Sequence, residues 1–266
     1  MKQDAFLDAI RLLCADDAPR VWSLIVTIFG DLALGESDTL SGPVLSAILS
    51  PVGVRPEAMR VALFRLRNEG WIETNKRGRE AFHALSEMGL VQSANASRKI
   101  YARERPAKVE WHLLCYPPAL SNDEQARALA MKPKGYVAVA AGVYLGNGVL
   151  EVPSSDAFLV QGQIGHVPEW LSLSLAPAGL RHSFEELTRV LKRVELGSVE
   201  QMSPLQIATL RALIVHRWRK LVLRLPDVPD ALFGSGFEGL TCRDEVMTTL
   251  DHLPRPALSV LKSSPL

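Results

Sequence analysis

The segment from Leu40 to Leu85 constrains the fold of this chain more than any other part of the sequence. It contains a short apolar run, a turn at Gly53, a second run that carries several arginines, and a hairpin with a basic tip. Gly53 permits a tight turn, and Pro56 suits the first turn of the second helix. The order helix, turn, helix, hairpin is typical of a winged helix-turn-helix, which places its second helix in the major groove of duplex DNA.

A helical wheel of residues 57–67 gives the second helix two distinct faces. The predicted core face consists of Met59, Ala62, Leu63 and Leu66. The opposite face mixes apolar and charged residues, namely Arg60, Val61, Phe64 and Arg67, with Glu57 and Arg65 at its margins. Apolar side chains can contact thymine methyl groups, and arginine can hydrogen-bond to O6 and N7 of guanine. We therefore expect this face to enter the major groove; the alternative is that Val61 and Phe64 pack against a neighbouring helix.

The hairpin after the second helix has cations on both sides of Gly78. Such a wing can reach phosphates or the minor groove, although an ordinary solvated turn has the same composition. The candidate DNA-binding residues of the helix and the wing together are Arg55, Glu57, Arg60, Val61, Phe64, Arg65, Arg67, Lys76, Arg77 and Arg79.

The net charge of the whole chain is only +1, but its distribution is uneven. Residues 55–105 contain eleven Lys and Arg against six Asp and Glu, a net charge of +5, which leaves −4 for the rest. A basic module on a slightly acidic body favours attraction to DNA, and ordinary solvated surface charge is the alternative.

No pattern in the sequence predicts a catalytic set, a metal site or a cofactor. The three cysteines lie far apart, the six histidines are scattered, and no apolar run approaches the roughly 18 residues that span a bilayer. Gly234–Gly239 matches GxGxxG by letter, but a proline-rich loop precedes it instead of the strand that a dinucleotide site needs. The acidic N-terminal residues Asp4 and Asp8 do not fit a signal peptide, so we expect a soluble, cytoplasmic protein.

The remaining segments predict an α+β protein with several domains. Residues 4–15 have the pattern of an amphipathic helix, with Asp4 as its N-cap, and residues 21–34 fit a buried strand or, as we favour, a helix that closes the winged core. Strands are expected at 109–116, 136–140, 142–145 and 157–164, with a helix at 121–131 whose Ser121 and Glu124 form a capping box. Helices follow at 184–196, 204–225 and 240–253. The predicted domains are 1–95, a linker at 96–106, a split βαβ domain at 107–175 and a helical domain at 176–266.

The chain resembles the PaaX family, the repressors of phenylacetate catabolism. The resemblance is carried by four segments, Ser23–Asp31, Val54–Leu66 with its Val-Arg-Pro-Glu-Ala-Met-Arg-Val start, Glu69–Ile72, and Arg217–Pro229 with its Arg-Trp-Arg-Lys-Leu start. It implies an N-terminal winged helix, a middle domain similar to the ferredoxin-like Cas2 nuclease fold, and a C-terminal helical domain. It also implies a homodimer on operator DNA that is released by an aromatic acyl-CoA such as phenylacetyl-CoA.

Two functional alternatives remain open at this point: a nucleic-acid-processing enzyme that uses the middle domain, or a winged helix that binds protein. Nuclease activity is not expected, because the first strand of that domain ends in Tyr116-Pro117-Pro118, where a metal-binding acid is needed. The candidate effector-binding cations, which could equally be the solvated face of their helix, are Arg217, Arg219, Lys220 and Arg224.

Overall fold

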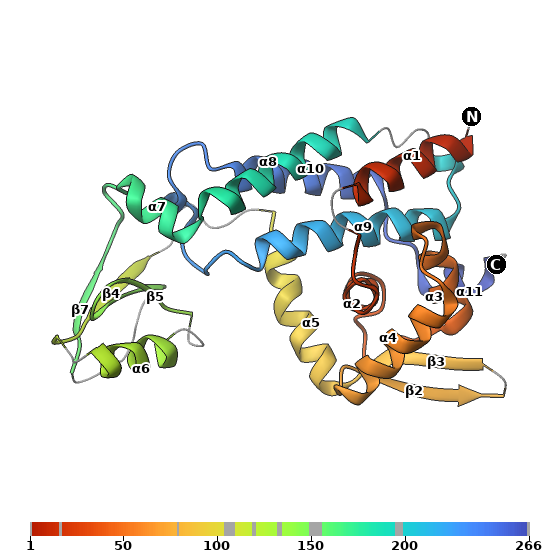
Figure 1. The fold of residues 1–266 in the computed structure, drawn as a ribbon, viewed down its shortest axis with the longest axis horizontal. Coiled ribbons are helices and arrows are strands. Elements are labelled where there is room, and N and C mark those ends of the chain that lie inside the picture. The colour runs from red at the N-terminus through yellow and green to blue at the C-terminus, as the bar shows by residue number, and fades with distance from the viewer. Residues whose placement is uncertain are drawn as a thin grey trace. The chain divides into compact units, whose positions relative to one another are not determined.

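Residues 2–15, 18–78, 80–103, 110–118, 121–131, 135–148, 156–194 and 199–264 are described by the computed structural model. Its architecture is mixed α+β, mostly helical, with two small antiparallel sheets (Figure 1). The contacts divide the chain into two units: unit 1 comprises Met1–Ala102, Phe184–Val222 and Thr241–Leu266, and unit 2 comprises Arg103–Ser183 and Leu223–Leu240. Each unit is therefore assembled from segments that are distant in the sequence. The division into three consecutive domains stays a prediction.

The first segment of unit 1 contains helices, one three-stranded sheet and a hairpin. Its elements are α1 (Lys2–Cys14), α2 (Val21–Leu32), β1 (Leu40–Ser41), α3 (Gly42–Leu49), the 3-10 helix η1 (Ser50–Val52), α4 (Pro56–Asn68), β2 (Ile72–Arg77), β3 (Glu80–Leu85) and α5 (Glu87–Ile100). The strand order is β1-β3-β2, and both pairings are antiparallel. The side chain of Asp4, the expected N-cap of the first helix, lies outside the described residues.

Local sequence explains where α3 and α4 begin. The Ser41 Oγ accepts a hydrogen bond from the Val44 amide at 3.4 Å, which satisfies one of the free N–H groups at the start of α3. Gly53 ends the intervening turn with a φ of 82°, a conformation that glycine adopts without steric cost. Pro56 then occupies the first helical position of α4, where its missing N–H costs nothing.

Two expectations about element type are resolved in unit 1. Residues 21–32 form helix α2, as we favoured, and Leu24 to Phe29 are all buried there despite their β-branched composition. The predicted linker is wrong at its start, because α5 continues through Asn95 to Ile100. The polar composition of that stretch reflects an exposed helix face, while Ser93 and Ile100 on its inner side are buried.

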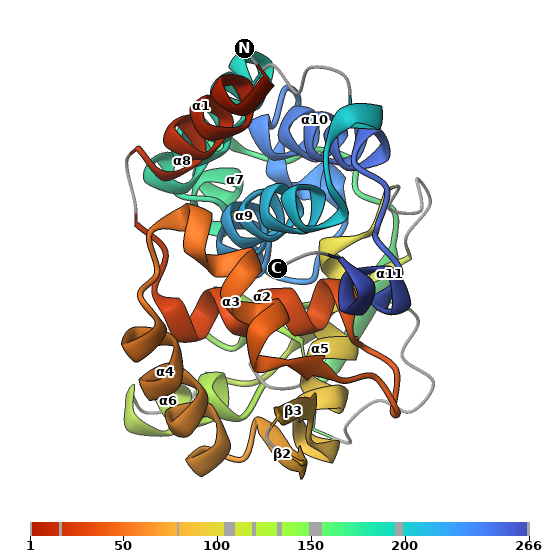
Figure 2. The same ribbon diagram turned by 90° about the vertical axis from the view of Figure 1, so that its right-hand side faces the viewer.

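Helix α9 (Pro204–Val222) packs through the middle of unit 1, and Figure 2 shows it among the helices of the N-terminal segment. It contacts α1, α2, α3 and α5. The Thr209 hydroxyl donates to the Ile48 carbonyl oxygen of α3 at 2.9 Å, and the Trp218 indole N–H donates to the Ile100 carbonyl oxygen of α5 at 2.8 Å. Most of α8 (Ala178–Arg193), most of α10 (Glu238–His252), the 3-10 helix η3 (Val199–Gln201) and α11 (Leu258–Ser263) complete the unit.

Unit 2 contains a four-stranded antiparallel sheet in the order β5-β6-β4-β7. The strands are β4 (Trp111–Cys115), β5 (Val137–Ala140), β6 (Val143–Asn147) and β7 (Phe158–Gly162), and α6 (Ser121–Met131) connects β4 to β5. The four strands and this helix were predicted, with ends that differ by a few residues. Further along the chain, unit 2 contains α7 (Glu169–Leu175) and the 3-10 helix η4 (Asp230–Phe233).

The core of this sheet lies against α6 and consists of Leu114, Met131 and Tyr144. Glu124 of α6 accepts hydrogen bonds from the Tyr144 hydroxyl at 2.6 Å and from the Gly142 amide at 2.8 Å. These bonds, the one from Tyr144 first, lower the pKa of Glu124. Glu124 thus ties the helix to β6, whereas we had predicted it as part of a capping box; the side chain of Ser121 lies outside the described residues.

Candidate nucleic-acid interface

Helix α4 presents the face that the helical wheel predicted. Met59, Ala62, Leu63 and Leu66 are buried, which confirms the predicted core side. The other candidates on this helix are exposed, and two of them are large apolar side chains: Val61 is 68% exposed and Phe64 is 57% exposed. Because a surface helix normally buries its large apolar residues, this face has the composition of a binding surface.

The charged residues of α4 are held by neighbouring side chains. Arg60 pairs with Glu57 at 2.8 Å along the helix, and both side chains remain mostly exposed to solvent. The Arg65 Nε donates to Glu69 at 2.7 Å, and its guanidinium lies 4.9 Å from the centre of the Trp22 ring of α2. Arg55 is exposed immediately before the helix.

Trp22 is a residue that the sequence reasoning did not assign to the site. It is partly exposed in the first turn of α2, and its ring meets Arg65 of α4 in a cation–π contact. No local sequence pattern predicts this contact, because Trp22 and Arg65 are far apart in the sequence. The contact connects α2 to the exposed face of α4.

The hairpin β2–β3 supplies the cations of the wing. Lys76 and Arg77 are exposed on β2, opposite Ala81 and Glu80 of β3. The Arg77 guanidinium lies 5.4 Å from the centre of the Phe82 ring, so an aromatic side chain supports it from the same hairpin. Arg79, the third predicted cation, lies outside the described residues.

The four predicted effector-binding cations do not form one cluster. The Arg217 guanidinium donates to the Leu13 carbonyl oxygen at 3.1 Å, at the end of α1, and Arg219 donates to the Thr27 hydroxyl of α2 at 3.2 Å. Both belong to the packing of α9 inside unit 1, and burial lowers the pKa of Arg219. Lys220 is exposed at the end of α9, and Arg224 belongs to unit 2. A binding role for Arg217 and Arg219 would compete with these helix contacts.

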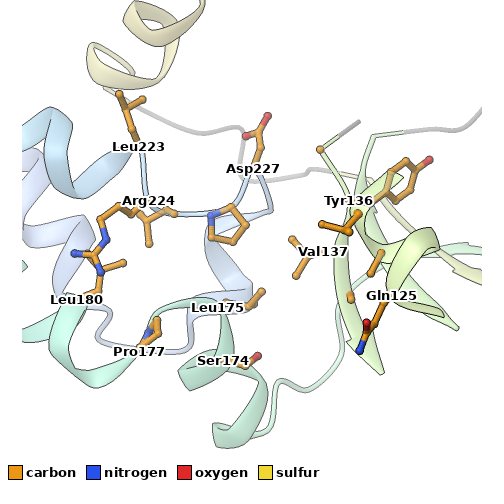
Figure 3. A pocket seen from close by; sticks show the side chains of 16 residues that line it. Gln125, Tyr136, Val137, Ser174, Leu175, Pro177, Leu180, Leu223, Arg224 and Asp227 are labelled. Atoms are coloured by element: carbon orange, nitrogen blue, oxygen red, sulfur yellow. The ribbon is translucent and has the colours of Figure 1, made fainter. Parts of the chain in front are cut away.

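Unit 2 contains a cavity of about 890 Å³, a volume within the usual range for small-molecule sites. Figure 3 shows its lining side chains, which come from α6, from β5 and the turn before it, from the end of α7 and the start of α8, and from the loop that follows α9. Most of them are apolar, including Leu129, Val137, Leu175 and Leu223. The Arg224 guanidinium lies at the side of the cavity near Leu180, away from Val137 (Figure 3).

The GxGxxG-like segment has a structural explanation. Arg181 of α8 donates to the Phe233 carbonyl oxygen at 2.7 Å and pairs with Glu238 at 3.0 Å, while its guanidinium lies 5.0 Å from the Phe237 ring centre. Glu238 starts α10 and therefore places a negative charge where a nucleotide phosphate would have to bind. In the described parts of the chain, no group of three or more His, Cys, Asp or Glu side chains could hold a metal ion.

Comparisons with known proteins identify the class to which this fold and this surface belong. The family model of PaaX-like proteins matches residues 20–89, and the model of the PaaX-like protein C-terminal domain matches residues 178–263. Together they cover more than half of the chain, which belongs to the PaaX family.

The particular relative that supports this assignment is the transcriptional repressor PaaX of Escherichia coli (strain K12). It is 27% identical over 267 residues, which cover 89% of this chain and 81% of the relative. Among solved structures, an uncharacterized protein from Mycobacterium tuberculosis matches 86% of this chain and 95% of its own, with 16% identity and a TM-score of 0.48. No helix in the described ranges is both long and apolar enough to cross a membrane.

Proposed function

We propose that this chain is a DNA-binding transcriptional repressor of a catabolic operon and is not an enzyme. The observation that carries the proposal is the exposed face of α4, where Val61 and Phe64 lie among arginines, followed directly by a basic hairpin. A helix with this mixture matches the chemistry of base edges in the major groove, and the hairpin cations match the phosphate backbone. The curated relative, a transcriptional repressor, supports the same function.

The proposed layout is a winged helix-turn-helix, a ferredoxin-like (Cas2-like) middle domain and C-terminal helices. The first assignment is supported by the succession of α2, α3 and α4 before the β2–β3 hairpin, which pairs with β1. The second is supported by the order β5-β6-β4-β7 and by the α6 connection, since a split βαβ unit inserts a later strand between the two that its helix joins.

The alternative of a nucleic-acid-processing enzyme is less well supported. The first strand of the middle sheet ends next to Tyr116, whose ring stacks edge-on with Tyr144 at 5.9 Å and receives the Arg127 guanidinium at 4.7 Å. Glu124, an acidic residue of α6, accepts hydrogen bonds from the Gly142 amide and from the Tyr144 hydroxyl of β6. Two-metal chemistry requires several acidic oxygen ligands that face a common point, and the described residues contain no group of three or more His, Cys, Asp or Glu side chains that could hold a metal ion.

A gel-shift assay with the promoter region of the chain's own operon tests the DNA-binding function. Arg60→Ala should lower affinity by about 1–3 kcal/mol and relax specificity at one position. Arg77→Ala should weaken binding to all duplexes alike and reduce the salt dependence by about one ion. Arg189→Ala is the control. Arg189 is an exposed cation of α8, and Figure 1 shows this helix on the opposite side of unit 1 from β2 and β3. Unchanged binding by both interface variants would contradict the assignment.

The finer proposal is a cytoplasmic homodimer on operator DNA that is released by an aromatic acyl-CoA. The cavity of unit 2 supports an effector of this kind, because its apolar lining and the cation at one side suit an apolar body with an anionic group. Release requires the effector to bind better to the form that does not hold DNA. Phenylacetyl-CoA should therefore dissociate the operator complex, and Val137→Trp, which fills the cavity, should keep DNA binding while it abolishes this response.

A further inference from the structure

The cationic side chains on the exposed face of α4 have partners on neighbouring residues, and apolar side chains are exposed beside them. Arg60 is paired with Glu57, Arg65 with Glu69 and Trp22, and Arg67 lies against the Phe64 ring at 5.2 Å. Val61 is 68% exposed on the same face, about as much as the side chain of Arg60. The exposed face of α4 therefore offers apolar contact area, from Val61 and Phe64, beside its exposed cations.

Val61 and Phe64 are also placed for a joint contact. They are three positions apart on one helix, so their Cβ atoms are neighbours about 5–6 Å apart on the same surface. The Arg67 guanidinium covers one side of the Phe64 ring, which restricts the ring orientations and leaves the ring 57% exposed. Two apolar side chains at this spacing can each meet one base pair of a short run.

The only apolar group on the major-groove edge of a base pair is the C5-methyl group of thymine. The Arg65 guanidinium lies over the Trp22 ring of α2 and pairs with Glu69, whereas Val61 and Phe64 can offer a base pair only an apolar contact. We infer that Val61 and Phe64 read thymine methyl groups in the operator, one thymine for each side chain. This inference rests on the proposed DNA-binding function and specifies what kind of sequence α4 recognises.

The test uses the full-length chain and a duplex that it selects from a random pool. Each thymine of the selected site is replaced singly by deoxyuridine, which removes the methyl group and leaves every hydrogen-bonding atom in place. Affinities are measured by fluorescence anisotropy for the unaltered chain, for Val61→Ala and for Phe64→Ala. Val91→Ala is the matched control, because Val91 on α5 is also an exposed valine, at 54%.

We expect two thymine positions in each half-site at which deoxyuridine weakens binding about fourfold, the effect of one buried methyl group. Val61→Ala should make the chain insensitive to deoxyuridine at one of these positions, and Phe64→Ala at the other. Val91→Ala should leave both effects unchanged. The salt dependence of binding should be the same for all four proteins, because none of the changes removes a charge.

Selected duplexes that bind equally well with deoxyuridine at every position would overturn the inference and leave the DNA-binding function intact. The same holds if Val61→Ala and Phe64→Ala bind like the unaltered chain and respond to deoxyuridine in the same way. If no duplex is enriched from the pool, the proposed function fails together with the inference. Thermal unfolding of the variants checks that each is folded, as expected for exposed positions.

Discussion

The Arg211 guanidinium of α9 donates two hydrogen bonds to the Asp31 carboxylate of α2, from Nε at 2.8 Å and from Nη2 at 2.7 Å. Both side chains are buried, with 6% and 1% exposed. The Tyr101 hydroxyl donates to the same carboxylate at 2.6 Å, and burial, followed by the Asp31 charge, raises the pKa of Tyr101. Removing one partner of such a buried pair is strongly destabilising, because it leaves the other charge buried without compensation.

Asp31→Ala should therefore lower the free energy of unfolding by about 3–5 kcal/mol, because Arg211 is left buried without a counter-charge. Urea denaturation measures this change. Asp8→Ala is the control, since Asp8 forms a pair of similar length with Arg11 on the surface of α1 and should cost less than about 1 kcal/mol. Equal effects of the two variants would mean that the Asp31 pair does not hold α2 to α9.

The N-terminal segment should not fold by itself. A fragment that ends at residue 102 contains every element from α1 to α5, but it lacks α9, which packs against four of those helices. The buried residues Leu210, Ile214 and Trp218 of α9 would leave their partners in the fragment exposed to water. Circular dichroism with urea should reveal no cooperative unfolding transition for residues 1–102, whereas the full chain should have one. A fragment that unfolds cooperatively and binds DNA would contradict the shared core.

Glu57→Gln should increase affinity for unrelated duplexes. The carboxylate of Glu57 repels phosphates and holds Arg60 at 2.8 Å, so its neutralisation removes the repulsion and frees the cation. Non-specific binding should tighten about three- to tenfold and become more salt-dependent by about one ion, while the ratio of operator to non-specific affinity falls. Asp8→Asn removes a carboxylate from the corresponding surface pair of α1 and should change neither quantity. Anisotropy titrations at several salt concentrations decide the outcome.

Stability should decrease in mildly acidic solution because of His83 in β3. Burial, and then the charge of Arg67, lower the pKa of this imidazole below its ordinary value of 6.5. The unfolded state therefore binds a proton at a higher pH than the folded state, and the free energy of unfolding falls as the pH drops below 6.5. Urea midpoints between pH 5 and 8 measure this slope. His83→Gln should flatten it; an equally steep slope in this variant would assign the pH dependence to other groups.

Much of the candidate interface was predictable from local sequence. Periodicity alone separated Met59 and Leu66 from Val61 and Phe64, because the two faces of α4 differ in burial and therefore in the residues that they tolerate. The turn at Gly53 and the start of α4 at Pro56 followed from backbone preferences of these two residues. DNA contacts by the ten candidate residues stay a prediction.

What could not be predicted depends on contacts between distant segments. Arg217 and Arg219 have the composition of an anion-binding cluster, but their partners on α1 and α2 lie about two hundred residues away in the sequence. The contact between Arg65 and Trp22 could not be predicted for the same reason, because it depends on the packing of α4 on α2. The prediction of a linker was also wrong for residues 96–100, because an exposed helix face and a linker contain the same polar residues.

The central position of α9 sets the order in which this molecule can be completed during synthesis. The ribosome finishes α4 and the hairpin long before it adds Thr209, Arg211 and Trp218, which join α2, α3 and α5. A nascent chain thus contains the exposed face of α4 before α9 is present to complete the core of unit 1. A premature stop codon anywhere between residues 103 and 203 would spare every candidate DNA-binding residue and still remove α9.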